Sequence, residues 1–340
     1  MIKEGSIMKT FQFTDAPVQI CGLNHIDPEK REFWRLSDED GAAVSDGVRG
    51  RSKTTAGARV RFRTNTRTLK LKMTLHTLGV DPCIPICGSG GADVMRGTAE
   101  NTVYMGLINP WSYDNKSPES VFHLDGTMQQ ITVNLPRNER VAGLEISVDD
   151  DAELLEPAPF TRPGKLCFYG SSITEGGCCT RTGNAYTAAV SRWLDMDYIN
   201  YGFSGLARGE DAMADVIARD DYAALIYDYD HNAPDAAHLE KTHERFFRRI
   251  REARPDLPIL IMTKPDFDSD PVGNAKRREV IYRTYLNARA AGDRKVWFLD
   301  GVQLFGTFGR EMCSVDNCHP NDLGFYRMAE KVYAMLLKML

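Results

Sequence analysis

The second half of this 340-residue chain alternates short apolar runs with longer amphipathic segments, and this alternation limits the possible folds most strongly. The apolar runs are continuous, as in strands that are buried on both faces of a parallel sheet. We expect strands at 165–170, 198–203, 223–230, 258–265 and 295–300. We expect helices at 184–196, 209–220, 236–254, 274–292 and from 320 to the end of the chain. Five such β/α alternations predict a three-layer α/β/α fold with a parallel sheet.

The first half has a different rhythm and reads as all-β up to about residue 160. Residues 57–75 alternate apolar and basic side chains with a period of two, broken by a turn at Asn65-Thr66, which predicts a hairpin with one buried face. Residues 129–136 and 142–150 repeat the alternation. We therefore expect a jelly-roll-like β-sandwich over 1–160 and an α/β domain over 161–340, joined at the proline-rich segment 156–165.

Composition excludes several classes of protein. The net charge of −5 argues against nucleic-acid binding, and no apolar run approaches the roughly 20 residues that span a bilayer. The N-terminal segment lacks the apolar core of a signal peptide. The eight cysteines follow no zinc or disulfide pattern, and Cys167 reads as a small core residue. We expect reduced thiols, a cytoplasmic location, and neither a metal nor a cofactor.

Polar clusters follow four of the expected strands, at 170–176, 200–205, 228–234 and 313–322. Sites in parallel sheets form at the carboxyl ends of the strands. One edge of the sheet would therefore receive a serine, a glycine-rich turn, an asparagine and an Asp-x-x-His sequence.

This set of residues suits acyl transfer. A serine hydroxyl is a weak nucleophile until a positioned base removes its proton. His319 is the candidate base, and Asp316, three residues earlier, can hold its imidazole in the required tautomer. Pro320 suits the first turn of the last helix, which would support His319.

The oxyanion of a tetrahedral intermediate needs preorganised hydrogen-bond donors. The backbone N–H groups of Ser172 and Gly205 and the side-chain amide of Asn232 are the available candidates. Two other readings remain: Asp316 and His319 as a helix cap, and Asn232 as an ordinary turn residue.

The four clusters together resemble the SGNH (GDSL-type) hydrolases. Gly170 to Thr174 is similar to the family's Gly-Asp-Ser-Ile-Thr block, which places the nucleophile at Ser172. Asn200 to Gly205 matches the second block, Asn232 the third, and Asp316-x-x-His319-Pro320 the fourth. The resemblance covers residues 165–340 and implies a flavodoxin-like catalytic domain. A preceding all-β domain is similar to the two-domain esterases of this group.

Two positions depart from the family pattern. Ser171 stands where the family usually has aspartate, and the third block reads Asp-His-Asn-Ala. We name Ser171 and His231 as candidate substrate-binding residues, with a structural role for His231 as the alternative. His238 and His243, on a charged helix, are expected to be solvated.

The resemblance implies a serine esterase that acts through an acyl-enzyme, with a small molecule or oligosaccharide as its partner. The expected substrate carries a short acyl group, such as acetyl, on a carbohydrate or another small polar alcohol. The sequence contains no apolar, lid-like helix of the kind that would indicate a lipase. Two alternatives remain: an acyltransferase of the same fold, and a carbohydrate-binding protein with a residual site. The sequence does not predict the oligomeric state.

Overall fold

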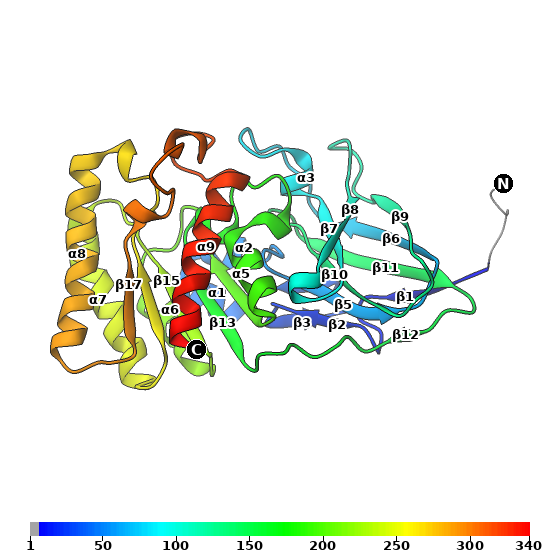
Figure 1. The fold of residues 1–340 in the computed structure, drawn as a ribbon, viewed down its shortest axis with the longest axis horizontal. Helices are drawn as coiled ribbons and strands as arrows, with labels where there is room; N and C mark the ends of the chain where they lie inside the picture. Colours follow the sequence, from blue (N-terminus) through cyan, green and yellow to red (C-terminus); the bar gives the residue numbers. More distant parts are fainter. Residues whose placement is uncertain (1–6) are drawn as a thin grey trace. The chain divides into compact units, whose positions relative to one another are not determined.

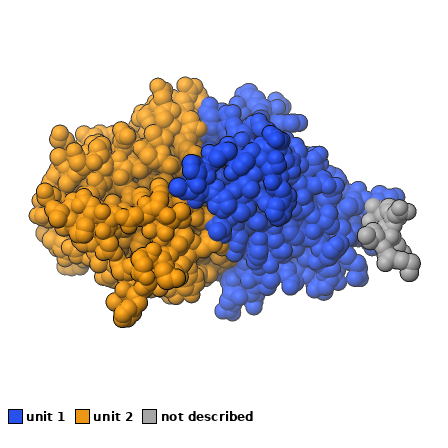
Figure 2. Space-filling model, turned by 90° about the horizontal axis from the view of Figure 1, so that it is seen from above, with its two compact units in different colours: residues 1–35, 53–161, 180–183 blue, residues 36–52, 162–179, 184–340 orange. Residues whose placement is uncertain are grey.

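The computed structural model describes residues 7–340, so the first six residues of the segment examined for a signal peptide lie outside the described residues. The chain divides into two compact units, coloured separately in Figure 2. Unit 1 comprises the residues up to Arg35, Lys53–Thr161 and Thr180–Gly183. Unit 2 comprises Leu36–Ser52, Arg162–Cys179 and Asn184–Leu340. Two short segments, 36–52 and 180–183, thus belong to a unit other than the one that holds their neighbours in sequence.

Unit 2 is built on a five-stranded parallel sheet with the order β14-β13-β15-β16-β17 (Figure 1). Its strands are β13 (Lys165–Gly170), β14 (Asp197–Gly202), β15 (Ala224–Asp228), β16 (Ile259–Met262) and β17 (Val296–Leu299). This 2-1-3-4-5 order is that of the flavodoxin-like fold, as expected. Gly170 is in register with both Gly202 and Asp228, so the first three strands end side by side.

Helices cover both faces of this sheet. The helices α5 (Tyr186–Leu194) and α9 (Asp322–Met339) pack on one face. The helices α6 (Asp211–Arg219), α7 (Ala236–Ala253) and α8 (Pro271–Ala290) pack on the other. The start of α9 differs from the prediction: Asn321 caps the helix through its side chain, and Pro320 precedes it. His319 therefore lies in the loop before the helix, stabilised by that loop's own hydrogen bonds.

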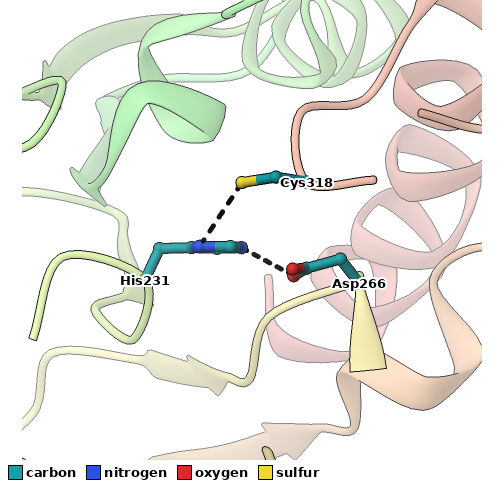
Figure 3. Close-up of side chains that lie close together, drawn as sticks. All are labelled: His231, Asp266 and Cys318. Atoms are coloured by element: carbon teal, nitrogen blue, oxygen red, sulfur yellow. Dashed lines mark hydrogen bonds and ion pairs between the residues drawn. The ribbon is translucent and has the colours of Figure 1, made fainter. Parts of the chain in front are cut away.

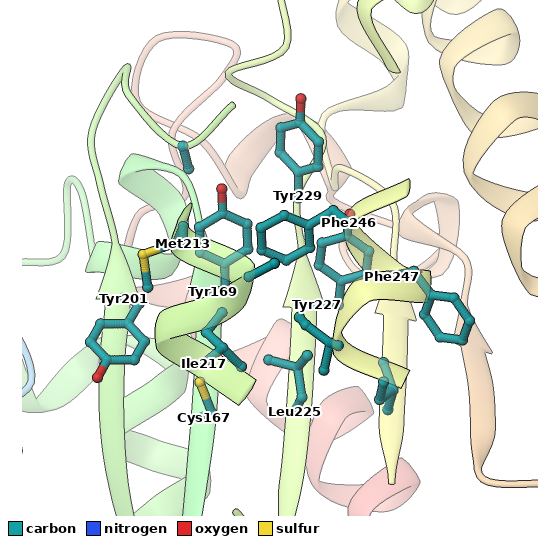
Figure 4. Close-up of a cluster of buried hydrophobic side chains, with 14 of the residues drawn as sticks. Cys167, Tyr169, Tyr201, Met213, Ile217, Leu225, Tyr227, Tyr229, Phe246 and Phe247 are labelled. Carbon is teal, nitrogen blue, oxygen red and sulfur yellow. The ribbon is translucent and has the colours of Figure 1, made fainter. Parts of the chain in front are cut away.

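Aromatic side chains fill the layer between the sheet and α7 (Figure 4). Phe246 stacks on Tyr169 and Tyr227, with ring centroids 4.7 and 5.2 Å apart. His243 lies in the same layer with no exposed surface, so the expectation that it is solvated is wrong. Its Nδ1 is 2.9 Å from the Thr284 hydroxyl, and burial lowers its pKa to about 3, which keeps the imidazole neutral.

Segment 36–52 forms two short helices, α1 (Asp38–Val44) and α2 (Asp46–Arg51), in a region expected to be all-β. Each begins at a serine, Ser37 or Ser45, whose hydroxyl accepts a backbone N–H of the first turn. An ion pair between Asp40 and Arg219 joins α1 to α6. These helices therefore belong to unit 2 although they lie far from its other parts in sequence.

Unit 1 contains two antiparallel sheets that enclose a hydrophobic core, together with a small two-stranded sheet and the helix α3 (Ile86–Ser89). The four-stranded sheet has the order β1-β11-β6-β9, with strands Met8–Gln12, Val141–Asp149, Thr68–Leu75 and Glu119–His123. The six-stranded sheet has the order β12-β5-β10-β7-β8 plus β2 beside β5, with strands Leu154–Leu155, Arg59–Thr64, Gln129–Asn134, Ala92–Arg96, Val103–Ile108 and Gln19–Cys21. The small sheet pairs β3 (His25–Asp27) with β4 (Glu32–Trp34).

The predicted hairpin over residues 57–75 is wrong. Its two strands, β5 and β6, lie in different sheets, where β5 pairs with β10 and β6 pairs with β11. The turn at Asn65-Thr66 connects one sheet to the other. The Thr66 hydroxyl in this turn donates a hydrogen bond to the carboxylate of Asp149, the last residue of β11, at 2.8 Å. Alternation correctly indicated strands with a buried face, but it does not identify the partner strand.

Segment 180–183 joins unit 1 through a buried carboxylate on β7. Asp93 accepts the backbone N–H of Gly183 at 2.9 Å and pairs with Arg181 at 2.6 Å. All eight cysteines lie within the described residues, and Cys167 is fully buried as expected. Over residues 7–340, no helix combines the length and apolar character needed to span a bilayer. The cytoplasmic location stays a prediction.

Candidate active site

The proposed nucleophile lies at the first position of a one-turn helix, α4 (Ser172–Glu175), directly after β13. The Ser171 hydroxyl accepts the N–H of Ile173 at 3.1 Å and so caps this helix. Gly170 has no room for a Cβ, because a Cβ there would overlap the Thr174 hydroxyl and the backbone carbonyl of Asp228. The tight strand exit and the cap together hold Ser172 at the end of the strand.

The structure brings together the three side chains that the sequence suggested for nucleophile, base and orienting acid. Ser172 Oγ lies 2.8 Å from Nε2 of His319, and His319 Nδ1 lies 2.7 Å from Oδ2 of Asp316. Both are hydrogen-bond distances, so a proton can pass from the serine to the imidazole while the carboxylate holds the other ring nitrogen protonated.

A tight turn over 316–319 fixes the acid relative to the base. Asp316 Oδ1 accepts the backbone N–H of His319 at 2.7 Å and that of Cys318 at 3.2 Å. Partial burial raises the pKa of the Asp316 carboxyl, but its hydrogen bonds from the backbone and the ring of His319 outweigh this, so the pKa lies below its usual value. Asp316 therefore stays ionised wherever His319 can act as a base.

Three candidate oxyanion donors lie after β13, β14 and β15. Among the residues that the structure describes, the N–H groups of Ser172 and Gly205 donate to no protein acceptor. Gly205 has a φ of +73° and open space beside its Cα. Asn232 donates one amide hydrogen to the carbonyl of Phe203 at 2.8 Å, which leaves its second amide hydrogen for a ligand.

A buried carboxyl group stabilises the one-turn helix α4, which holds the proposed nucleophile. Asp228, at the end of β15, accepts the hydroxyls of Thr174 and Tyr186, each at 2.9 Å. Burial raises the pKa of Asp228 to about 7, against the lowering effect of these two hydrogen bonds. Thr174 is thus anchored to the neighbouring strand, two residues beyond Ser172.

A second support comes from α2 and was missed in the sequence. The guanidinium of Arg51 contacts both carboxylate oxygens of Glu175, with its Nε at 2.9 and 3.1 Å and its Nη2 at 2.7 Å. The Glu175 side chain has no exposed surface, and that of Arg51 is 23% exposed. Because 124 residues separate the two, no local pattern could have predicted this pair.

The two candidate substrate-binding residues differ in their surroundings. Ser171 is buried and caps α4, so its hydroxyl supports the turn that holds Ser172. His231 belongs to a second polar cluster, in which its Nε2 lies 2.6 Å from Oδ1 of Asp266 and its Nδ1 lies 3.8 Å from Sγ of Cys318 (Figure 3).

The acidic and thiol members of this cluster have shifted pKa values. Burial raises the pKa of Asp266, but its hydrogen bond with His231 and the charge of Lys264, 3.1 Å away, outweigh this and lower it to about 2. Burial, together with the carboxylates of Asp266 and Asp316, raises the pKa of Cys318 to about 12. Cys318 is therefore a thiol near neutral pH and a poor nucleophile compared with a thiolate.

Comparison with known families identifies the class of protein. Residues 164–337, just over half of the chain, match the GDSL-like lipase/acylhydrolase family. Residues 11–154 match the family described as the N-terminus of SGNH-hydrolase-type esterases. The chain belongs to the GDSL-like lipase/acylhydrolase family and is therefore an enzyme that acts on ester bonds.

Solved structures share this fold, and the matches include residues of both units. A protein from Bacteroides ovatus assigned as a GDSL-like lipase is 24% identical, with a TM-score of 0.86 and 98% of each chain covered. The salicylyl-acyltransferase SsfX3 of a tetracycline biosynthetic pathway is 19% identical, with a TM-score of 0.77 and 98% of each chain covered. A family two carbohydrate esterase from Clostridium thermocellum, in complex with cellohexaose, is 15% identical, with a TM-score of 0.61 and 84% and 94% of the chains covered. The comparison with curated proteins found no match.

Proposed function

We propose that this protein is a serine esterase that removes a short acyl group from a carbohydrate or another small polar alcohol. The main support for this proposal is the chain of hydrogen bonds that runs from Ser172 Oγ to His319 Nε2 (2.8 Å) and from His319 Nδ1 to Asp316 Oδ2 (2.7 Å). Family membership supports ester chemistry, and the geometry supports Ser172 as the group that receives the acyl.

In the acylation step, Ser172 Oγ attacks the ester carbonyl carbon while its proton moves to Nε2 of His319. The negative charge that develops on the carbonyl oxygen is stabilised by the N–H groups of Ser172 and Gly205 and the amide of Asn232. Collapse of the intermediate breaks the bond to the leaving oxygen, which takes the proton from His319 as the alcohol departs.

In the deacylation step, water attacks the acyl-enzyme and gives one proton to His319. The second tetrahedral intermediate then collapses, the acid leaves, and the proton returns to Ser172. Asp316 remains ionised throughout and stabilises the imidazolium in both steps. Cys318 is an unsuitable nucleophile for this chemistry, because its raised pKa keeps it protonated.

The choice of a short acyl group on a polar alcohol rests on the kind of protein that shares the fold. A family two carbohydrate esterase shares the fold over 84% of this chain and 94% of its own, and it was solved in complex with cellohexaose. A series of aryl esters of increasing acyl length, assayed beside acetylated mono- and oligosaccharides, tests this choice. We expect kcat/KM to be highest for acetyl esters, and a preference for octanoyl or longer esters would refute the substrate proposal.

Transfer of the acyl group to an acceptor other than water is the second candidate function. It is favoured by the fold match to the acyltransferase SsfX3 over nearly the full length of both chains. Both functions share the acylation step and differ only in the group that attacks the acyl-enzyme. Product analysis with an added alcohol or amine distinguishes them: an esterase yields mainly free acid, whereas a transferase yields mainly the acylated acceptor.

A further inference from the structure

The cluster of His231, Asp266 and Cys318 has no part in the ester chemistry described above. The three residues come from the loops after β15 and β16 and before α9 (Figure 3). Because the sheet is parallel, the loops after β15 and β16 lie at the same edge as the turn after β13 that holds Ser172. One ring nitrogen of His231, one carboxylate oxygen of Asp266 and the sulfur of Cys318 all lie within 4.8 Å of one another. The histidine and aspartate side chains are only 13% and 4% exposed, so the cluster is largely enclosed.

These three donors form a suitable set for a thiophilic divalent cation. Zinc binds thiolate, imidazole and carboxylate ligands at about 2.0–2.3 Å, which places neighbouring donors about 3.3–3.7 Å apart in a tetrahedral site. Sγ of Cys318 lies 3.8 Å from Nδ1 of His231, near this separation, whereas Asp266 contacts the other ring nitrogen, Nε2, at 2.6 Å. Because one ion binds one ring nitrogen, coordination by all three residues requires the side chains of His231 and Asp266 to rotate out of their hydrogen bond. Three protein ligands then leave a fourth position open.

The charges around the cluster include one opposing cation. Lys264 Nζ lies 3.1 Å from Oδ2 of Asp266, whereas His231 contacts Oδ1, so the two oxygens have different partners. The carboxylate of Asp316 also interacts electrostatically with Cys318, and it accepts the backbone N–H of Cys318 at 3.2 Å. Two carboxylates therefore face the thiol against one ammonium group, which favours binding of a divalent cation.

We propose that His231, Asp266 and Cys318 form a binding site for a thiophilic divalent cation, such as zinc or cadmium, beside the active site. Metal binding releases the Cys318 thiol proton to solvent and forms the metal–sulfur bond. The same turn over 316–319 holds both Cys318 and the proposed base His319, because both donate backbone N–H groups to Asp316. A bound metal that draws Cys318 toward His231 therefore shifts the base away from Ser172 and slows hydrolysis; this consequence rests on the proposed function.

The primary test measures binding and does not depend on activity. The full-length protein, freed of metal with a chelator, is titrated with cadmium while the ultraviolet absorption of cadmium–thiolate bonding is recorded. We expect saturation at one cadmium per chain in the wild type and in Cys83→Ser, which removes an exposed thiol elsewhere. Cys318→Ser should abolish the signal, and His231→Gln should weaken binding at least tenfold. Circular dichroism and thermal unfolding confirm that each variant is folded.

The competing arrangement uses Cys318 with Asp316 and His319, whose donor atoms also lie within 4.8 Å of one another. Asp316→Asn distinguishes the two, since it removes a ligand of that arrangement only. The proposal is overturned if the signal survives Cys318→Ser, or if Asp316→Asn abolishes it while His231→Gln binds as the wild type does.

A second measurement tests the effect on hydrolysis. Cadmium should inhibit wild-type hydrolysis of an aryl acetate over the range in which the absorption saturates, and Cys318→Ser should be resistant. Saturation of the absorption without inhibition would refute the coupling to the active site. Absence of hydrolysis in the metal-free wild type would instead refute the proposed function, leaving the binding result intact.

Discussion

Replacement of Arg51 by methionine tests the support that α2 gives to the nucleophile turn. The substitution keeps much of the side-chain volume but leaves the fully buried Glu175 carboxylate without its guanidinium partner. Removal of one partner from a buried ion pair costs about 3–5 kcal/mol. Because the Arg51 side chain is 23% exposed, water can partly replace it, and we expect the lower end of this range, about 3 kcal/mol.

Thermal unfolding followed by circular dichroism measures this loss. For a unit of this size, about 3 kcal/mol corresponds to a fall of roughly 6–12 °C in the unfolding midpoint. The double variant Arg51→Met with Glu175→Gln removes both charges and should recover most of the loss. Arg249→Met is the matched control, because Arg249 pairs with Asp215 on the surface, where an ion pair adds little.

Arg51→Met should also affect catalysis, since Glu175 and Ser172 lie on the same single-turn helix. We expect Arg51→Met to lower kcat/KM for an aryl acetate by about 10- to 100-fold, because small displacements of a catalytic group are costly. Arg51 does not stabilise α4 through Glu175 if Arg51→Met unfolds within about 2 °C of the wild type and the double variant is no more stable than the single variant.

Three further substitutions test other parts of the site. The pKa of Asp228 is about 7 in the folded protein against 3.8 ordinarily, so the folded state retains a proton that the unfolded chain has lost, and this group's contribution to stability falls as the pH rises through that window. Asp228→Asn should therefore flatten the dependence of the unfolding midpoint on pH between about 4 and 7; an unchanged slope would contradict this. Asn232→Ala should lower kcat by about 10²–10³-fold with little change in KM, as expected for an oxyanion donor, whereas a change in KM alone would assign it to substrate binding. Asp316→Asn should lower kcat by about 10³–10⁴-fold, and activity within a few-fold of the wild type would show that His319 needs no carboxylate.

Much of unit 2 could be predicted because its signals are local. Continuous apolar runs identified the five strands, and the parallel arrangement then placed every strand-end cluster on one edge. The arrangement of Ser172, Asp316 and His319 follows from that placement. The burial of His243 could also have been predicted from the sequence. His243 lies four residues after Leu239 and three before Phe246, which places it on the apolar face of α7.

Other features depend on contacts between distant parts of the chain, which local periodicity does not report. Alternation showed that β5 and β6 are strands but not that they pair in different sheets. The helices α1 and α2 are only seven and six residues long and contain glycines, so their sequences carry a weak helical signal. The Arg51–Glu175 pair and the His231–Asp266–Cys318 cluster depend on the completed fold for the same reason.

Covalent labelling of the nucleophile tests the central claim most directly. The wild-type protein, Ser171→Ala and Ser172→Ala are each treated with a fluorophosphonate, and the adduct is located by peptide mass spectrometry while aryl acetate hydrolysis is measured in parallel. Ser171→Ala is the matched control, since it removes the adjacent hydroxyl and a helix cap but leaves the proposed nucleophile. We predict an adduct on Ser172 in the wild type and in Ser171→Ala, with neither adduct nor hydrolysis in Ser172→Ala. An adduct on another residue, or undiminished hydrolysis by a folded Ser172→Ala variant, would contradict the assignment.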